Sequence, residues 1–166
     1  MNNKKFGFTL IELLLYTALA GVILLAVSAF IFVVWQGQAK SQTIAEVEQQ
    51  GTQIMDNILR QVKNSSGINS PVLATSGVTM SLATSTINNP IVFDQNSNQI
   101  RIKLGSALAL PLNNSRVNVS NLMFYNYGRS GTNGSIRVQF TLTHVNPGNK
   151  NSYDYSQTFY GTATKR

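Results

Sequence analysis

Cysteine is absent from this chain of 166 residues, and histidine occurs only once, as His144. Without cysteine the chain can form neither a disulfide nor a thiolate-ligated metal site. A single histidine cannot by itself build a zinc site or a Ser–His–Asp triad, so we interpret His144 as a residue near the end of a strand whose polar atoms are satisfied by hydrogen bonds. These absences predict a protein without enzyme activity and without a cofactor.

Acidic residues are also scarce, since six Asp and Glu stand against 13 Lys and Arg, a formal net charge of +7. Beyond residue 64 the only acids are Asp94 and Asp154, so a carboxylate pair for acid–base catalysis is not expected. The basic residues are mostly dispersed along the chain. Such an excess suits attraction to acidic surfaces or nucleic acid, but it is also typical of an ordinary solvated surface.

Asp94, Asn96 and Asn98 have the spacing of the first ligands of a calcium-binding loop. An EF-hand loop needs glycine at its sixth position and a bidentate glutamate at its twelfth. This chain has Gln99 and Gly105 at those positions. The segment is therefore interpreted as a turn in preference to a calcium site.

Proline is absent before Pro71, and this early part of the chain contains a long apolar run. From Phe8 to Trp35 the sequence is apolar except for a few hydroxyls and one acid, Glu12. The charge-free stretch 13–39 would span ~40 Å as a helix, more than the bilayer's hydrocarbon core of about 30 Å. The run therefore predicts a membrane-spanning helix.

Two plainer interpretations account for this run less well. A secretory signal peptide would be shorter and would end in a small-x-small cleavage site, whereas residues 32–36 are Phe-Val-Val-Trp-Gln. A simple anchor leaves Glu12 unexplained, because a carboxylate inside a membrane segment is costly and indicates function by default. Lys4 and Lys5 precede the run, so the positive-inside rule predicts a cytoplasmic N-terminus and an extracytoplasmic C-terminal portion.

Residues 7–14, Gly-Phe-Thr-Leu-Ile-Glu-Leu-Leu, resemble the processing motif of type IV prepilins and type II secretion pseudopilins. The resemblance implies that a prepilin peptidase cuts after Gly7 and that the new N-terminal residue, Phe8, is methylated. Gly7 has no side chain, so its backbone can lie extended against a peptidase. Further implied partners are other pilin or pseudopilin subunits, an inner-membrane assembly platform and membrane lipid.

Glu12 is the fifth residue after this cleavage point and corresponds to the family's glutamate. Cleavage would free a cationic amine on Phe8, and the Glu12 carboxylate can neutralise it where an unpaired charge is penalised. Residues 8 and 12 are neighbours on one helix, so an internal pair is one option. The resemblance implies the other option, a pair with the N-terminus of an adjacent subunit, and the sequence does not separate the two.

The chain departs from many major pilins of this family in two respects. Ala29 stands at the twenty-second mature position, where many major pilins have proline. The disulfide-closed C-terminal loop of those proteins cannot form here without cysteine. Without that proline the helix lacks the usual kink. The missing disulfide and the modest predicted sheet favour a minor subunit or a pseudopilin, while a pilus, a secretion filament and a DNA-uptake filament all remain open.

Helical periodicity continues beyond Trp35 in a more polar composition. Apolar or small residues recur at spacings of three and four and form one stripe: Ile44, Val47, Gly51, Ile54, Met55, Ile58, Leu59 and Val62. With no breaker before the sequence Asn64-Ser-Ser-Gly67, we predict one helix over 8–64, ~85 Å long. Its stripe is expected to pack on a C-terminal sheet, with a coiled coil as the alternative.

The remainder of the chain has the pattern of short strands separated by turns. We predict an antiparallel sheet of four to six strands, with long loops over 65–90. The expected strands are 91–93 and 100–104, which form a hairpin, then 117–125, 136–142 and a last strand marked by Tyr153, Tyr155, Phe159 and Tyr160. Between 136 and 142, Ile, Val, Phe and Leu alternate with polar residues, which indicates one buried face.

Cations and aromatic rings occur together in this C-terminal part: Arg101, Lys103, Arg116, Arg129 and Arg137 with Phe124, Tyr125 and Tyr127. Such a mixture could bind DNA, with cations on phosphates and rings on bases. The simpler interpretation places the rings in the core and the cations on a solvated surface. A DNA- or surface-binding tip subunit is therefore the alternative function.

Together these observations predict a pilin-like α+β fold in four segments. They are a leader peptide over 1–7, a transmembrane and assembly helix over 8–35, an amphipathic continuation over 36–64, and an extracytoplasmic β-rich domain over 65–166. The principal expectation is a structural subunit of a type IV pilus-like or type II secretion filament, assembled through its N-terminal helix.

Overall fold

The computed structural model describes residues 7–129 and 134–165. Its contacts divide the chain into two compact units, Met1–Ala39 and Lys40–Arg166. The first unit contains the apolar part of one long helix. The second contains the rest of that helix and all the described strands.

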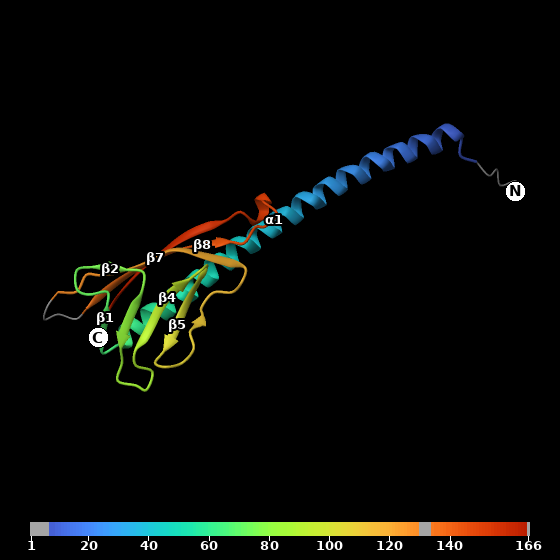
Figure 1. Cartoon of the computed structure of the whole chain (residues 1–166). Helices are drawn as coiled ribbons and strands as arrows, with labels where there is room; N and C mark the ends of the chain where they lie inside the picture. Colours follow the sequence, from blue (N-terminus) through green and yellow to red (C-terminus); the bar gives the residue numbers. More distant parts are fainter. Residues whose placement is uncertain (1–6, 130–133, 166) are drawn as a thin grey trace, which may run out of the picture. The chain divides into compact units, whose positions relative to one another are not determined.

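Helix α1 runs from Leu10 to Asn64 without interruption (Figure 1). It begins two residues later than predicted and ends where the sequence indicated. At its end Ser65 turns the chain, since its backbone N–H and its hydroxyl both reach the Val62 carbonyl, at 3.3 and 2.8 Å. The prediction of one continuous helix is therefore confirmed.

The strands form two antiparallel sheets, so the expectation of a single sheet is wrong. The five-stranded sheet has the order β1-β3-β4-β5-β6, and the four-stranded sheet has the order β2-β7-β8-β9. The first sheet comprises β1 (Gly67–Ser70), β3 (Met80–Ala83), β4 (Ile91–Asn96), β5 (Gln99–Leu104) and β6 (Leu110–Pro111). The second comprises β2 (Ser76–Gly77), β7 (Val117–Asn126), β8 (Ser135–His144) and β9 (Ser156–Thr164).

Two other details differ from the sequence prediction. Residues 65–90 hold three short strands, β1, β2 and β3, in place of long loops. The last strand begins only at Ser156, so Tyr155 precedes it and Tyr153 lies in the 3-10 turn Asn151–Tyr153. Both errors have one cause. The strands β1, β2 and β3 and the 3-10 turn have only two to four residues each, too few to show a period in the sequence.

The predicted β4–β5 hairpin is present with a shorter turn than expected. Asp94 lies opposite Arg101 in the ladder, and its two carboxylate oxygens accept bonds from the guanidinium at 2.9 and 2.8 Å. This bidentate pair holds Asp94 within the strand, and the chain reverses at Ser97, whose φ is 53°. The interpretation of this segment as a turn is correct for residues 97–98, and the Asp94 carboxylate is engaged by Arg101.

The second half of α1 and both sheets share one core. The helix contributes a buried stripe of the predicted spacing, including Val47, Ile54 and Ile58. Strand β8 alternates as expected, with Ile136, Val138, Phe140 and Leu142 fully buried. The stripe thus packs on the chain's own sheets, as predicted.

Two glycines let α1 approach β9 closely. A Cβ placed on Gly51 would overlap the ring of Phe159, and one placed on Gly161 would overlap the Met55 side chain and lie 3.0 Å from Leu59 Cδ1. The Phe159 ring of β9 therefore occupies the space over Gly51, and the Met55 side chain of α1 occupies the space over Gly161. Phe159 also stacks on Phe140 at 5.5 Å. We call this contact the α1–β9 interlock.

The interlock makes Gly51 sensitive to a single added methyl group. Alanine normally stabilises a helix interior by ~1 kcal/mol over glycine. In Gly51→Ala the methyl group collides with the Phe159 ring, so we expect a net loss of about 1–3 kcal/mol, typical of overpacking. Thermal unfolding of the full chain in detergent micelles measures this.

Gly37→Ala is the matched control, because nothing lies within 4 Å of its added Cβ. It should leave the melting temperature unchanged or slightly raised. A Gly51→Ala chain as stable as the Gly37→Ala chain would contradict the interlock.

Candidate processing and assembly site

The N-terminal half of α1 exposes apolar side chains on all its sides. Phe8, Leu10 and Leu25 are 78%, 82% and 74% exposed, and none of residues 8–37 is buried. A helix that is hydrophobic all round belongs in an apolar surrounding. In the part of the chain that the structure describes, α1 is the one helix long and apolar enough to cross a membrane, and it fits a single-pass anchor.

Thr9 and Glu12 form a capping box at the start of this helix. The Thr9 backbone N–H and hydroxyl both donate to Glu12 Oε2, each at 2.9 Å, and the Glu12 backbone N–H donates to Thr9 Oγ1 at 3.3 Å. Thr9 is thus the N-cap and Glu12 the third helical residue, the arrangement that satisfies two otherwise unpaired donors. The first helical bond follows, from the Leu13 N–H to the Thr9 carbonyl at 3.2 Å.

This cap directs the Glu12 carboxylate back toward the start of the chain. Because Thr9 follows Phe8 directly, the carboxylate lies close in sequence and in space to the residue that cleavage would make N-terminal. Both hydrogen bonds that the Glu12 carboxylate accepts from Thr9 use Oε2, so Oε1 takes no part in the cap. The local geometry therefore leaves one carboxylate oxygen to accept a further donor.

The predicted scissile bond lies ahead of the helix, in irregular backbone. Neither Gly7 nor Phe8 is helical, and nothing lies within 4 Å of where a Gly7 Cβ would be. The Phe8 ring folds back along the helix, edge-on to Tyr16 at 6.1 Å. A peptidase needs an accessible backbone outside a helix, and this segment offers one. Lys4 and Lys5, predicted to fix the topology, lie outside the described residues.

The capping box is visible in the sequence as Thr-x-x-Glu before an apolar run, although the role predicted for Glu12 concerns only its charge. A cap gives the acid a local reason to be present. It leaves the predicted pairing with an N-terminal amine untested.

A comparison with protein-family models matches residues 2–28 to the prokaryotic N-terminal methylation motif. The matched residues include Gly7, Phe8, the cap and the first turns of the apolar helix. Neither a curated protein nor a solved structure is similar enough to match the chain.

The chain therefore carries the signature of type IV pilins and pseudopilins on an α+β, pilin-like architecture. The motif implies processing by a prepilin peptidase and assembly with other pilin subunits. It ends at residue 28, so it describes the anchor and leaves the sheets without a match.

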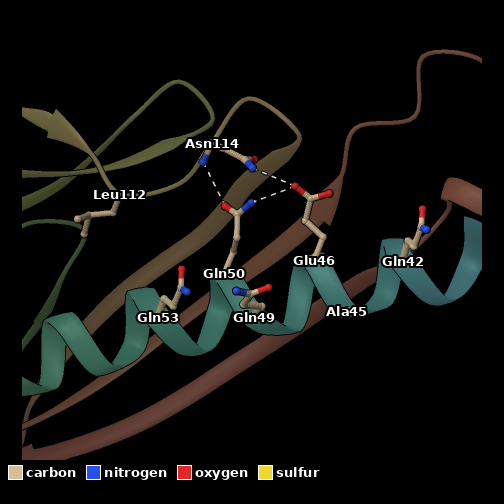
Figure 2. A pocket seen from close by; sticks show the side chains of 8 residues that line it. All are labelled: Gln42, Ala45, Glu46, Gln49, Gln50, Gln53, Leu112 and Asn114. Atoms are coloured by element: carbon tan, nitrogen blue, oxygen red, sulfur yellow. Dashed lines mark hydrogen bonds between the residues drawn. The ribbon is translucent and has the colours of Figure 1, made fainter.

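A polar notch lies along α1 in the second unit, beside the segment that joins β6 to β7. Figure 2 shows the side chains that line it: Gln42, Ala45, Glu46, Gln49, Gln50, Gln53, Leu112 and Asn114. Asn114 donates its amide to Glu46 at 2.9 Å and its backbone N–H to Gln50 at 3.1 Å (Figure 2). These bonds attach the helix to the β6–β7 segment, so we assign the notch a structural role.

Glu46 is the centre of this attachment. Arg116 lies 3.4 Å and His144 Nε2 lies 3.9 Å from its carboxylate. Partial burial acts to raise the pKa of Glu46, but the Asn114 bond and the charge of Arg116 outweigh it, so the pKa lies below its ordinary value. His144 stacks on Tyr153 at 5.8 Å at the end of β8, the strand-end position expected from the sequence. Its buried Nδ1 has no hydrogen-bond partner among the described residues, so the expectation that its polar atoms are satisfied is wrong for this nitrogen.

Some of the cations and rings predicted to bind DNA are buried or paired in the structure, and others lie together on one sheet. Phe124 is fully buried in the core, and Arg101 and Arg116 are paired with acids. Three residues of this set, Tyr125, Tyr127 and Arg137, lie on the four-stranded sheet or directly after β7. Tyr160 of β9, which is not in the set, lies on the same sheet. Tyr125 stacks on Tyr127 at 6.3 Å, and Arg137 lies over the Tyr160 ring at 5.3 Å. We call these four residues the tyrosine–arginine face.

Within the described residues, no three His, Asp or Glu side chains gather in a way that could hold a metal ion.

Proposed function

We propose that this chain is a minor subunit of a type IV pilus-like or type II secretion filament, trimmed after Gly7 and methylated on Phe8. One observation carries the proposal: the Gly7–Phe8 bond lies in accessible backbone directly before a capped, all-round apolar helix that matches the methylation motif. The chain acts as a structural component and has no enzymatic role.

The proposed topology places Lys4 and Lys5 in the cytoplasm and residues 65–166 outside the membrane, on the positive-inside rule. The exposed apolar side chains of residues 8–35 contact lipid before assembly. The inner-membrane assembly platform then takes up the trimmed chain. Ala29 in place of proline and the absence of a disulfide support a minor subunit or a pseudopilin.

Glu12 has two roles in this proposal. Its Oε2 caps the helix through Thr9, and its Oε1 accepts the amine that cleavage creates on Phe8, in the same chain or in an adjacent subunit. Because the two roles use different oxygens, one carboxylate can fill both. A charged pair of this kind is favoured in an apolar surrounding, where either charge alone is costly.

The mature N-terminus tests the processing step. In cells with an active prepilin peptidase, mass spectrometry should find a chain that begins with methylated Phe8. Cells without the peptidase should contain the full chain. Retention of residues 1–7 in the presence of the peptidase would exclude the pilin-type role.

Three variants separate the cap from the charge. Glu12→Gln keeps an oxygen for the cap but removes the negative charge, Glu12→Ala removes both, and Thr9→Val removes the capping hydroxyl alone. We expect all three to remain in the membrane, with both Glu12 variants incorporated into filaments about tenfold less or worse, the equivalent of about 1.4 kcal/mol. Thr9→Val, which loses about 1 kcal/mol of capping, should still be incorporated.

Quantitative blotting of sheared filaments against membranes gives the incorporated fraction. If Glu12→Gln assembles normally while Thr9→Val does not, the carboxylate is a helix cap and the amine pairing is rejected.

A second candidate function is DNA binding by a tip subunit, favoured by the tyrosine–arginine face alone. Tyr127 and Tyr160 are 59% and 58% exposed there and offer rings for bases, with Arg137 beside them for phosphate. Three other residues of the predicted DNA-binding set argue against this function. Phe124 is buried in the core, and Arg101 and Arg116 are paired with acids.

Full-length chain in detergent micelles, mixed with single-stranded DNA across a salt series, tests this candidate. Binding should weaken steadily as salt rises, and Arg137→Gln should weaken it severalfold. The control is Lys103→Gln, an exposed cation on β5 of the other sheet, which should have no effect. The absence of salt-sensitive binding at low salt would exclude the DNA role.

A further inference from the structure

In the described part of the chain the two sheets end in four edge strands, and three of these are short or interrupted. β2 and β6 have two residues each, and β6 ends in Pro111. β1 has four residues and an irregular register between Ile68 and Ser70. Shortness, proline and bulges are the usual devices that stop an edge from pairing with another chain.

β9 lacks all of these devices. It has nine residues, Ser156–Thr164, and pairs with β8 along its full length without a shift in register. It contains neither proline nor a charged residue. A long, regular and uncharged edge is the kind that accepts an added strand.

The direction of the backbone groups of β9 follows from two hydrogen bonds beyond its ends. The His144 N–H donates to the Tyr155 carbonyl at 2.9 Å, and the Lys165 N–H donates to the Gly134 carbonyl at 2.9 Å. Residues bonded to the neighbour alternate in an antiparallel ladder. Odd-numbered residues of β9 therefore bond to β8, and even-numbered residues direct their N–H and C=O groups to the open edge.

The same even-numbered residues carry the side chains of the outer face: Ser156, Thr158, Tyr160, Thr162 and Thr164. Two of their hydroxyls are already paired with β8, Thr158 with Thr141 and Ser156 with Thr143, each at 2.9 Å. These pairs lie on the face and leave the edge clear. The groups that β9 presents sideways are thus backbone donors and acceptors.

Apolar surface continues beneath this edge. Phe159 faces Gly51 of α1, and Leu59 lies under Gly161, yet both Phe159 and Leu59 are only partly buried. A strand added beside β9 would extend the sheet over this flank of the helix and cover both side chains.

The direction of β9 restricts which strand can be added. Phe159 packs at Gly51, Gly161 at Met55, and Lys165 binds the Ser66 carbonyl just past the helix end, so β9 runs in the same direction as the second half of α1. Subunits of one filament share their helix direction. A second copy could thus offer its β9 only in parallel, the slightly less stable pairing.

We infer that the free edge of β9 is a docking site for an extended strand of a different protein chain, added antiparallel to β9 within the filament. The inference rests on the proposed filament role. Both cations and acids lie near this edge: Arg137 lies over Tyr160 and Lys165 follows the strand, while Asp154 precedes it and Glu48 lies 3.5 Å from the Tyr155 hydroxyl. β9 itself is uncharged, and its free groups are backbone donors and acceptors. The partner strand is therefore uncharged where it pairs with β9, with no proline at the positions that bond to β9.

Proline variants test the backbone contact. Thr158→Pro and Thr162→Pro each remove an N–H that points to the open edge and leave the bonds to β8 in place. Thr158→Val and Thr162→Val are the matched controls, because they keep the N–H and lose only the hydroxyl. We expect the proline variants to be trimmed normally and to melt close to the valine variants, but to be incorporated into filaments at least about tenfold less.

Hydrogen exchange on the unaltered chain gives an independent measurement. The amides of Thr158, Tyr160 and Thr162 should exchange quickly in the isolated full-length chain in micelles and about tenfold or more slowly in filaments. The amides of Phe159 and Ala163, which bond to β8, should be protected in both and serve as internal controls.

The outcomes separate this inference from the proposed function. Normal trimming and assembly, with edge amides that stay unprotected and proline variants that incorporate normally, would overturn the docking site and leave the filament role intact. Protection that appears in the isolated chain as its concentration rises would identify the partner as a second copy and would also overturn the inference. Failure of trimming would instead refute the proposed function.

Discussion

The structure depends on one unbroken helix that meets two environments along its length. Over its first half, apolar side chains are exposed on every side, a surface that the hydrophobic effect disfavours in water. From Thr43 onward only one stripe is buried, against strands of the same chain. Because no proline or other breaker separates the two halves, one covalent element carries both the anchoring surface and the surface on which the sheets fold.

The α1–β9 interlock makes the orientation of β9 depend on the helix. Gly51 must accept Phe159, and Gly161 must accept Met55, so the face that β9 turns to the helix is fixed. Since side chains alternate along a strand, the opposite face and its hydroxyl pairs with β8 are fixed as well. The helix covers the face of β9 but leaves its edge open, which is why the longest edge strand of the described structure is also the least protected.

Local pattern was sufficient for the elements that are long. The continuous helix, its end at Asn64 and the alternation of β8 all follow from periods that extend over several turns or pairs. The division into two sheets could not be predicted, because β1, β2 and β3 are shorter than any period and pairing is a matter of distant contacts. The turn predicted between β4 and β5 is too wide because Asp94 is a turn-forming residue by type, whereas its bidentate pair with Arg101 keeps it in the ladder. The capping box, by contrast, is present in the sequence as a spacing of three between Thr9 and Glu12, and the same residue also carries the charge for which the pairing with an amine is predicted.

The negative charge of Glu12 and its capping bonds with Thr9 both concern how a carboxylate is accommodated at the start of a membrane helix. A carboxylate at the start of a membrane helix must satisfy its oxygens locally, and Thr9 supplies two donors to Oε2. Those donors are neutral, so among residues 7–129 and 134–165 the negative charge of Glu12 has no cationic partner. In the proposed processing step, cleavage after Gly7 creates such a cation on Phe8, at the end of the chain toward which the cap already directs the carboxylate. The cap thus positions the acid, and the cut would supply its counter-charge, so the trimmed helix would be better suited than the precursor to an apolar filament interior.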